Sequence, residues 1–532
     1  MNHGSLKGYI LNALCKYSKN ILLEDDHCSW SGEQLSSHLQ CFITRVELQT
    51  MSHARVGVCF DNSSAQAIAI IAILLSDRVP VLINSVDLID GKIDWIRYAK
   101  LNFVLVSEAL DHLIKIPHLV IDSKGYPKKI VGKTNLSAEL EQVVYMPPSG
   151  TAFVLFTSGS TGEPKEVYIP ELGVIKTIDT LIEKFSLSEK SVAAVTLPVC
   201  HSMTLNTQFL PTFAVGGKSR FYNLRLSMNK IFRGFLADKA TFVALIGEVV
   251  RTCWEERRIK KLPFCEDVNH VQLAGGLISQ KHLEMTRELF PNAVIHKGYG
   301  LTEAIRVTMI SSKEEYFNTT SVGKPLNFLD LQIRNENGQE LPVGIYGEIH
   351  VRGESVMLGI RYLTAANYTL HSKDNYLRTG DLGMIDDKGN LHVSGRLDSL
   401  FKINGRRVSG FEIEKVALDA SEKFRFAKAI LVSDEDRDRS RIILFIELDR
   451  NCWKNEEVYL DSETQDRLEQ RIRTLTIPPK EIIFSRNIPR TSNGKLNLPK
   501  LKQIWKAQSL RPLEKTIVTN LKLFSLDEEI MA

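Results

Sequence analysis

The residues best suited to chemistry are residues 157–165, which read TSGSTGEPK. Gly159 and Gly162 permit positive φ and a close approach of the backbone, and the neighbouring hydroxyl groups add hydrogen-bond donors beside the backbone N–H groups. Lys165 adds a compact positive charge of the kind that meets phosphate oxygens. The stretch therefore predicts a loop that holds a polyanion.

The loop follows residues 152–156, AFVLF, an apolar run with the length and composition of a buried strand. Its spacing differs from the P-loop pattern G-x-x-x-x-G-K-[ST], because Pro164 precedes the lysine and Glu166 follows it. A P-loop NTPase is therefore not the first choice. Small polar residues are equally typical of a mobile surface turn, so the loop alone does not decide between the two.

The chain has 532 residues and a net charge of +4, from 67 basic and 63 acidic residues. This length is too great for one hydrophobic core, so we expect one large and one smaller domain, or two comparable ones. The balance of charge gives no reason to expect nucleic acid or a lipid surface as a partner, although a small anionic ligand is compatible with it.

The eight cysteines are scattered without a C-x-x-C pair or metal-ligand spacing, which is typical of a reducing cytosol. The first 20 residues lack the features of a signal peptide. The most apolar run, residues 67–75, is far shorter than the roughly 20 residues of a membrane-spanning helix. We therefore expect a buried helix there, no membrane span, and a cytoplasmic protein.

Short apolar runs alternate with helical stretches through the first 300 residues. We expect a strand on each side of the buried helix and further strands along the chain, at residues 56–60, 79–83, 103–106, 193–197, 241–246, 271–274 and 293–296. This alternation is typical of a parallel sheet with helices on both faces. Ligands bind such sheets where the loops gather beyond the strand ends.

The pattern changes between residues 347 and 396 to short, glycine-rich segments that indicate antiparallel hairpins. After residue 396 a smaller α+β unit of about 130 residues is expected. Its predicted elements are a hairpin at 400–403 and 407–409, a helix at 411–424, strands at 427–432 and 441–448, and a helix at 461–475. Residues 502–532 fit either a helix packed on the body or a frayed extension.

Five segments resemble, in order, the motifs of the adenylate-forming superfamily, which includes acyl-CoA synthetases, peptide synthetase adenylation domains and firefly-type luciferases. They are TSGSTGEPK, GYGLTEA from residue 298, YLRTGDLG from 376, GRLDSLFKINGRRVSGFEIE from 395 and PRTSNGKL from 489. Acyl- and aryl-CoA ligases carry the most similar motifs. The probabilities of independent chance matches multiply, so five matches in the same order are not reasonably explained by coincidence.

The resemblance implies an α/β fold in two domains. Residues 1–397 would form a large AMP-binding domain of parallel-rich sheets flanked by helices, with a small β-barrel-like part. Residues 398–532 would form a smaller, mobile α+β domain, with a hinge near residue 398.

In enzymes of this superfamily a carboxylate attacks the α-phosphate of ATP, so positioning and electrostatics do most of the work. By the resemblance, Tyr299 lies against adenine, Thr302 bonds the α-phosphate, and Glu303 holds Mg²⁺, which prefers carboxylate and phosphate oxygens. Asp381 accepts from the ribose hydroxyls, with Arg396 nearby. The resemblance implies three further sets of nucleotide contacts. The phosphate loop would contribute Thr157, Ser158, Gly159, Ser160, Thr161, Gly162 and Lys165. The backbone along the purine would be that of Gly275 and Gly276, and the GYG motif would add Gly300.

The smaller domain would supply the residues that change between the two half-reactions. Lys495 matches the catalytic lysine, which reaches the reacting carboxylate and the α-phosphate; an ordinary solvated lysine is the alternative. Asp398 matches the hinge position. Rotation about it would remove Lys495 and bring in the face that carries Lys402 for thioester formation.

Residues 196–206, TLPVCHSMTLN, match the segment that gates the acyl pocket, and His201 fits the gating histidine. Members that activate amino acids carry an aspartate here, but this chain has none between residues 194 and 213, and an unpaired buried ammonium would be costly. A fatty or aryl acid without an amino group is therefore favoured. Three positions depart from the family pattern, namely Cys200, Glu166 and Lys297.

The predicted function is activation of such an acid by ATP and Mg²⁺ to an acyl-adenylate, followed by transfer to coenzyme A. The alternative acceptor is the phosphopantetheine arm of a carrier protein, because both acceptors end in the same thiol. Arg406 and Arg407 could meet a nucleotide phosphate, an acidic carrier helix or only solvent. A luciferase-like oxygenase has no feature that selects it, and a non-catalytic nucleotide-binding module is disfavoured by Lys495, Glu303 and Asp381.

Overall fold

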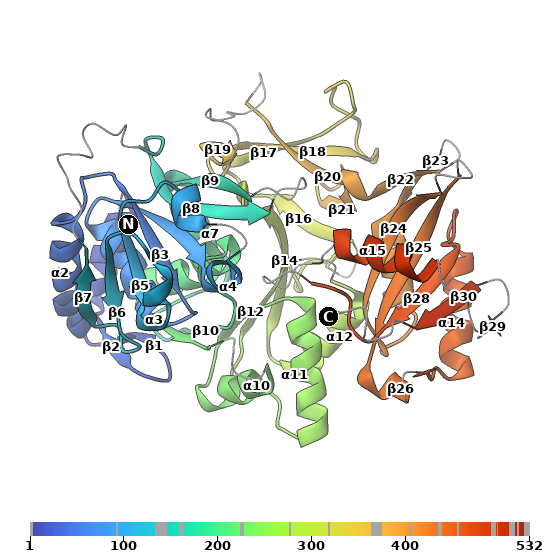
Figure 1. Ribbon diagram of the computed structural model, residues 1–532, viewed down its shortest axis with the longest axis horizontal. Helices are drawn as coiled ribbons and strands as arrows, with labels where there is room; N and C mark the ends of the chain where they lie inside the picture. Colours follow the sequence, from blue (N-terminus) through green and yellow to red (C-terminus); the bar gives the residue numbers. More distant parts are fainter. Residues whose placement is uncertain are drawn as a thin grey trace.

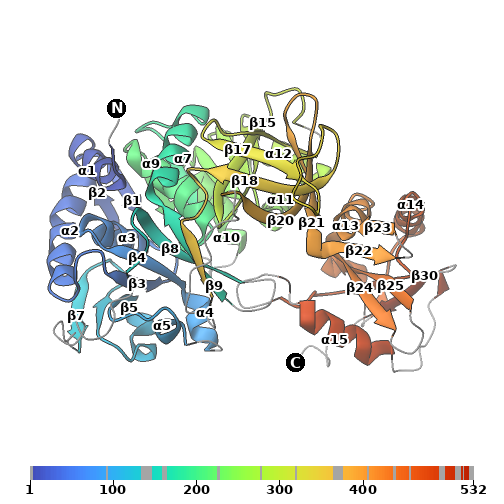
Figure 2. The same cartoon turned by 90° about the horizontal axis from the view of Figure 1, so that it is seen from above.

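The computed structural model describes residues 4–91, 94–132, 146–158, 164–223, 228–275, 278–317, 320–362, 375–403, 406–434, 439–454, 457–490, 496, 498–509, 517–518 and 521–525. Two large sheets with their helices form an N-terminal body, and a smaller C-terminal part lies beside it (Figures 1 and 2). This is the predicted α/β class. Within the described chain, no helix combines the length and the hydrophobicity that a bilayer crossing requires.

The first sheet has eight strands in the order β19-β9-β8-β4-β3-β5-β6-β7. In chain order they are β3 (Arg55–Phe60), β4 (Val79–Asn84), β5 (Val104–Ser107), β6 (His118–Ile121), β7 (Pro127–Val131), β8 (Thr151–Ser158), β9 (Pro164–Pro170) and β19 (Gly359–Tyr362). Strands β3 to β6 are parallel, as the alternating pattern predicts, whereas β9 returns antiparallel to β8.

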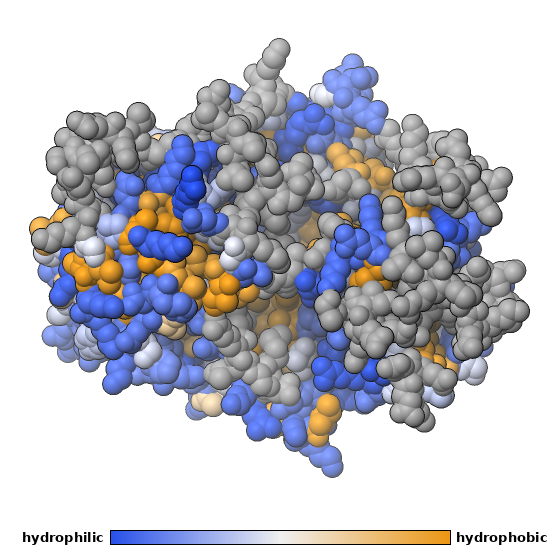
Figure 3. Space-filling view, in the orientation of Figure 1, coloured by the Kyte–Doolittle hydropathy of each residue, from blue (hydrophilic) through white to orange (hydrophobic). Residues whose placement is uncertain are grey.

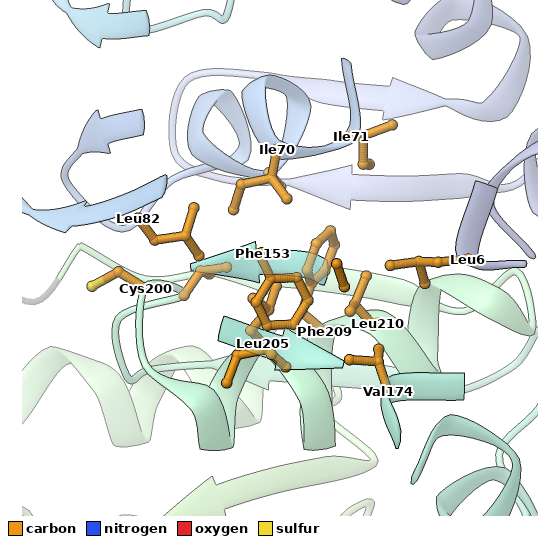
Figure 4. Close-up of a cluster of buried hydrophobic side chains, with 14 of the residues drawn as sticks. Leu6, Ile70, Ile71, Leu82, Phe153, Val174, Cys200, Leu205, Phe209 and Leu210 are labelled. Carbon is orange, nitrogen blue, oxygen red and sulfur yellow. The ribbon is translucent and has the colours of Figure 1, made fainter. Parts of the chain in front are cut away.

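The helix predicted from the most apolar run is α3 (Ser64–Leu75), and all but one of its residues are buried. The Ser63 side chain accepts from the Gln66 N–H and starts the helix. Figure 4 shows Ile70 on one side of the core and Leu205 and Phe209 on the other, with Phe153 of β8 between them. A helix that is apolar all round is stable only when it is covered on all sides.

The second sheet has thirteen strands in the order β17-β18-β20-β21-β16-β15-β14-β13-β12-β10-β11-β1-β2. In chain order they are β1 (Ile21–Glu24), β2 (Ser29–Ser31), β10 (Val192–Val195), β11 (Lys218–Phe221), β12 (Phe242–Leu245), β13 (His270–Leu273), β14 (Val294–Leu301), β15 (Ala304–Ser311), β16 (Ser321–Pro325), β17 (Leu329–Arg334), β18 (Gly347–Gly353), β20 (Leu377–Ile385) and β21 (Leu391–Arg396). The strands from β10 to β14 pair in parallel, and from β14 to β17 every pairing is antiparallel. The predicted hairpins are therefore present, and the pairings of the described strands leave this sheet open rather than closed into a barrel.

Helices cover both sheets. Those of the N-terminal body are α1 (Leu6–Lys16), α2 (Gly32–Glu47), α4 (Ser85–Asp90), α5 (Trp95–Tyr98), α7 (Glu171–Lys184), α8 (Ser202–Thr204), α9 (Leu210–Ala214), α10 (Met228–Ala237), α11 (Gly247–Lys260) and α12 (Gln280–Leu289). Figure 3 shows hydrophilic residues over most of the coloured surface, with apolar areas among them.

The C-terminal part has its own hydrophobic cores, built from residues between Phe401 and Trp505. Its strands and helices are β22 (Leu400–Ile403), β23 (Arg406–Ser409), α13 (Gly410–Leu418), β24 (Phe424–Asp434), β25 (Arg439–Leu448), β26 (Trp453–Lys454), β27 (Glu457–Val458), α14 (Ser462–Arg473), β28 (Glu481–Ser485), α15 (Leu498–Ser509), β29 (Ile517–Val518) and β30 (Leu521–Ser525). Helix α13 ends six residues before the predicted end at residue 424, because Phe424 pairs with Leu448 in the β24–β25 ladder.

The described part of the segment after residue 501 begins in a packed helix. Leu501, Ile504 and Trp505 of α15 are buried against the β24–β25–β28 sheet, so the helical alternative holds for residues 502–509. Strand β30 then pairs in parallel with β28, a pairing that the mixed apolar spacing did not predict.

One arginine joins the C-terminal part to the body. Arg251 of α11 is 2% exposed, and its guanidinium donates to the carbonyl oxygens of Glu422 at 2.6 Å and Phe424 at 3.1 Å. These bonds stabilise the observed arrangement of the two parts.

Glu166 forms a buried ionic cluster near the β19 edge of the first sheet. Its carboxylate accepts from Arg55 at 2.5 Å and from Arg361 at 2.7 Å through each oxygen, and the Tyr168 hydroxyl donates at 2.9 Å. The Glu166 side chain is 0% exposed, and those of Arg55 and Arg361 are 3% and 5% exposed. The cluster ties β3, β9 and β19 together beside Lys165, and Tyr98 O accepts a further bond from Arg361 at 2.8 Å.

We expect Glu166→Ala to lower the free energy of unfolding by about 3–5 kcal/mol, because it leaves two buried guanidinium groups without their carboxylate. Urea denaturation followed by circular dichroism measures the loss. The matched control is Glu266→Ala, which removes an exposed carboxylate and should change stability by less than about 0.5 kcal/mol. Equal stability of the two variants would contradict the structural role of the cluster.

Candidate active site

The β8–β9 hairpin positions Lys165. Thr157 pairs with Lys165 and Ser158 with Pro164, so β8 continues for two residues beyond the predicted strand. Thr157 and Ser158 therefore belong to the strand rather than to the loop. The four remaining loop residues of the prediction lie outside the described residues: Gly159, Ser160, Thr161 and Gly162.

Thr302 and Glu303 form the turn between β14 and β15. Backbone hydrogen bonds connect this turn to the β8–β9 hairpin: Met357 N donates to Glu303 O at 2.9 Å, and Leu358 N donates to Tyr168 O at 2.9 Å. The short segment before β19 thus holds the turn and the hairpin next to each other. Figure 1 shows β8, β9 and β14 meeting near the centre of the molecule.

The glycines of the GYG motif are required by close packing. A Cβ on Gly298 would lie 2.2 Å from Arg306 Nη1, and one on Gly300 would lie 2.8 Å from Arg306 N. Gly275, which follows β13, has φ +79, and a Cβ there would lie 2.8 Å from Ile246 Cγ2. These positions accept glycine alone without movement of the neighbours. Gly276 lies outside the described residues.

Asp381 is the centre of a polar cluster between β14 and the β20–β21 hairpin. The Tyr299 hydroxyl donates to Asp381 Oδ2 at 2.5 Å, and Arg396 Nη1 donates to Asp381 Oδ1 at 3.1 Å. Asp381 N donates to Thr379 Oγ1 at 3.0 Å. Burial and then the Asp381 charge raise the pKa of Tyr299 well above its ordinary value, so this phenol stays a donor. The structure therefore brings together three residues that are far apart in sequence.

The carboxylate of Asp381 has lone pairs beyond those that take these two bonds, which suits a further donor such as a ribose hydroxyl. Tyr299, fixed by its own hydroxyl, presents an aromatic ring beside it. These residues fit a nucleotide by their donor and acceptor chemistry.

The residues present also fit Mg²⁺ as a phosphate-bound ion. Among the described residues, no group of three His, Cys, Asp or Glu side chains is arranged to hold a metal. Glu303 alone suffices where phosphate oxygens and water supply the other ligands, which is the usual way Mg²⁺ is bound beside phosphates.

The gating segment leads into an unusual helix. His201 precedes α8, and its N–H donates to Pro198 O at 3.0 Å. The chain continues as the π-helix η2 (Leu205–Phe209), in which all five residues are buried. Single π-turns occur frequently at functional sites.

Two of the departures from the family pattern have structural explanations here. Cys200 is buried in the hydrophobic core of Figure 4, and burial raises the pKa of its thiol to about 12, so it is a core residue rather than a nucleophile. Burial and then the charge of Lys415 lower the pKa of Lys297 to about 8. The Lys297 ammonium lies 4.9 Å from the centre of the Phe317 ring.

The residues predicted for the C-terminal part are only partly described. Asp398 belongs to the short 3-10 helix η3 (Leu397–Ser399), and Lys402 pairs with Arg407 in the β22–β23 hairpin. Lys495 lies outside the described residues. The catalytic and hinge roles of these residues therefore stay predictions.

A family model described as AMP-binding enzyme matches residues 14–361, well over half of the chain. The chain belongs to this AMP-binding enzyme family. The match confirms the family resemblance of the motifs, and it includes the β8–β9 hairpin and the β14–β15 turn. Asp381 and the C-terminal part lie beyond it.

Relatives of this AMP-binding chain include ligases whose names give different acyl acceptors, coenzyme A in one and a carrier protein in another. It is 25% identical over 358 residues to 4-coumarate–CoA ligase 4 of Arabidopsis thaliana, covering 66% of this chain and 61% of that protein. It is 27% identical over 371 residues to a D-alanine–D-alanyl carrier protein ligase of Bacillus cereus, covering 66% and 70%. Among these and other relatives, the matched share of their own length runs from 12% to 73%.

The fold is also similar to that of solved structures. O-succinylbenzoate coenzyme A synthetase of Bacillus subtilis, in complex with AMP, superposes with a TM-score of 0.73 over 96% of this chain and 99% of that one, at 19% identity. At this identity the similarity shows a common fold with a large N-terminal and a smaller C-terminal domain, and it does not transfer a substrate.

Two charged residues near the site were not assigned by the motifs. Glu166 was recognised only as a departure, and its two arginine partners come from β3 and β19, which no local pattern links. Arg306 was not singled out at all, although a charge inside the apolar stretch AIRVTMI was a usable signal.

We expect Asp381→Asn to weaken ATP binding about 10- to 100-fold, because hydrogen bonds to a charged group contribute about 1.5–3 kcal/mol each. Isothermal titration calorimetry measures the affinity. Asp330→Asn is the matched control, since Asp330 also accepts from a tyrosine and an arginine, Tyr376 and Arg352, but is not part of the proposed site. Equal losses in the two variants would remove Asp381 from the nucleotide site.

Proposed function

We propose that the chain activates a carboxylic acid without an amino group by adenylation and then transfers the acyl group to the thiol of coenzyme A. The single observation that carries the proposal is the Tyr299–Asp381–Arg396 cluster at the edge of a family site whose turn and hairpin are held together by backbone hydrogen bonds. The similarity to an acid–CoA ligase of Arabidopsis thaliana supports it.

In the first half-reaction a carboxylate oxygen of the acid attacks the α-phosphorus of ATP, and pyrophosphate leaves with its bonding electron pair. Two anions must approach each other, so the protein lowers the barrier mainly by positioning and by positive charge. We assign nucleotide contacts to Lys165, Tyr299 and Asp381, and the α-phosphate contact to Thr302. Glu303 would hold Mg²⁺, which supplies charge neutralisation on the phosphates.

Lys495 is proposed to follow the negative charge that develops on the carboxylate and the α-phosphate. In the second half-reaction the thiolate attacks the acyl carbonyl carbon and AMP leaves. We propose a boundary at residues 397 and 398, with rotation about Asp398 bringing the Lys402 face toward the site. Such a rotation would have to break the bonds of Arg251 to Glu422 and Phe424.

The acid is proposed to lack an amino group. Residues 194–213 contain no aspartate or glutamate that could pair with an ammonium, and η2 within this stretch is fully buried. A buried ammonium without a carboxylate is strongly disfavoured. His201 is proposed as the gate of the acyl pocket.

The acceptor is proposed to be coenzyme A, and a carrier protein is the competing acceptor because one relative bears the name of a carrier protein ligase. Both present a phosphopantetheine thiol to the same adenylate. The experiment below therefore includes both.

The test is acid-dependent exchange of labelled pyrophosphate into ATP over a panel of fatty, aryl and amino acids, followed by thioester detection with coenzyme A or a pantetheinylated carrier protein. We expect exchange with a non-amino acid, a thioester with coenzyme A, and a loss of exchange of about 100- to 1000-fold in Lys495→Ala.

Lys502→Ala is the matched control, because it removes an exposed lysine of α15 seven residues further on and should leave exchange unchanged. Exchange with amino acids alone would overturn the acid class. Thioester formation only on the carrier protein would overturn coenzyme A as acceptor.

A further inference from the structure

Arg306 of β15 is a buried cation for which the described residues supply no counterion. It is 6% exposed, and within the described chain its guanidinium makes no ion pair or hydrogen bond. Burial alone lowers its pKa, to about 10, so the group is still protonated at neutral pH. A buried, unpaired charge is among the most costly features of a folded chain, and strongly perturbed ionisable groups cluster at functional sites.

The guanidinium of Arg306 lies against Gly298 on one face of the second sheet. Arg306 Nη1 would be 2.2 Å from a Cβ at Gly298, so glycine is needed for the arginine to fit. Arg306 has φ +44, which is uncommon for a residue with a side chain, and the β14–β15 register shifts nearby. His296, two residues before Gly298, shares this face, and its pKa is lowered to about 3 by burial and then by nearby cations that include Arg306.

Other polar atoms on this face also lack partners. Gln272 of β13 is the register partner of His296, and its amide nitrogen donates to Thr207 Oγ1 of η2 at 2.7 Å. Among the described residues, Gln272 Oε1 and Asn206 Oδ1 have no hydrogen-bond partner although both are fully buried. The unpartnered atoms of Gln272 and Asn206 therefore lie where η2 meets β13, and η2 overlaps the end of the segment assigned to the acyl pocket.

We propose that Arg306 binds a second carboxylate on the acid that is activated, so that the substrate is a dicarboxylic acid. The inference rests on the proposed function and specifies its substrate class. The planar guanidinium matches a carboxylate through two parallel hydrogen bonds, and the bound anion supplies the missing counterion.

The position of Arg306 indicates that the carboxylate it binds is not the carboxylate that attacks ATP. Gly298, against which the Arg306 guanidinium lies, precedes Thr302 by four residues, a separation of at most about 13 Å along an extended strand. An acid that bridges the two positions would present one carboxyl group to Arg306 and the other to the α-phosphate site. Lys297, the neighbouring buried cation, alternates to the opposite face of β14, so it does not take this role.

The test compares each dicarboxylic acid with its monomethyl ester in the pyrophosphate exchange reaction of the full chain. The half-ester keeps the length and the reacting carboxylate but lacks the second charge. Straight-chain and aromatic diacids of increasing length serve as probes. We expect the best diacid to exceed its half-ester about 100-fold in kcat/KM, mainly through KM, because a site built for a charged partner rejects the analogue that lacks it.

Arg306→Met should abolish the preference for the diacid, and Arg306→Lys should keep part of it. Lys297→Met is the matched control and should leave the preference intact. The melting temperature of the ligand-free chain separates binding from structure: Arg306→Met should melt at a higher temperature than the wild type, since it removes an unpaired buried charge. If Arg306 instead had a structural role, Arg306→Met would melt at a lower temperature than the wild type.

Equal kcat/KM for diacids and half-esters in the wild type would overturn the second-carboxylate inference and leave adenylation in place. Absence of exchange with every acid would instead overturn the proposed function. In that case a lower melting temperature for Arg306→Met, with no stabilisation of the wild type by any diacid, would overturn the inference as well.

Discussion

The carboxylate of Glu166 is buried between two guanidinium groups, and the geometry of the first sheet depends on this arrangement. Arg55 comes from the start of β3, and Arg361 from β19, more than 190 residues after Glu166 in the chain. Each ion is taken out of water, so removal of one would leave the others uncompensated, and the cluster ties β3, β9 and β19 together. Lys165 precedes Glu166 directly, so the cluster also fixes the backbone of Lys165 in the β8–β9 hairpin.

The site is assembled by backbone hydrogen bonds as much as by side chains. The segment before β19 bonds to Glu303 on one side and to Tyr168 on the other, which places the β14–β15 turn next to the hairpin. Asp381 of β20 accepts a hydrogen bond from Tyr299 of β14 and so connects these two strands of the second sheet. Because these connections lie on strands and tight turns, the side chains are positioned before a ligand arrives, which is the condition for electrostatic catalysis.

The buried polar side chains of the two sheets differ in the partners that they have. Glu166 pairs with Arg55 and Arg361 and thereby contributes to a defined fold. Among the described residues, side-chain atoms of Arg306, Gln272 and Asn206 are buried without a hydrogen-bond partner in the second sheet and the adjoining helix η2. A folded protein keeps such atoms at a cost in stability, which a bound ligand can offset.

The sequence by itself determined the α/β class, most parallel strands, the buried helix α3 and the family, because these depend on local apolar periodicity and on ordered motifs. It did not determine the end of α13, since Phe424 fits a helix pattern as well as a strand and only pairing with Leu448 decides. Tertiary structure alone decided that β30 joins the C-terminal sheet, that Glu166 has two arginine partners and that Arg306 has none among the residues that the structure describes. Partners of this kind come from distant strands, and the burial that makes a charge costly is a property of the packed fold and not of the local sequence.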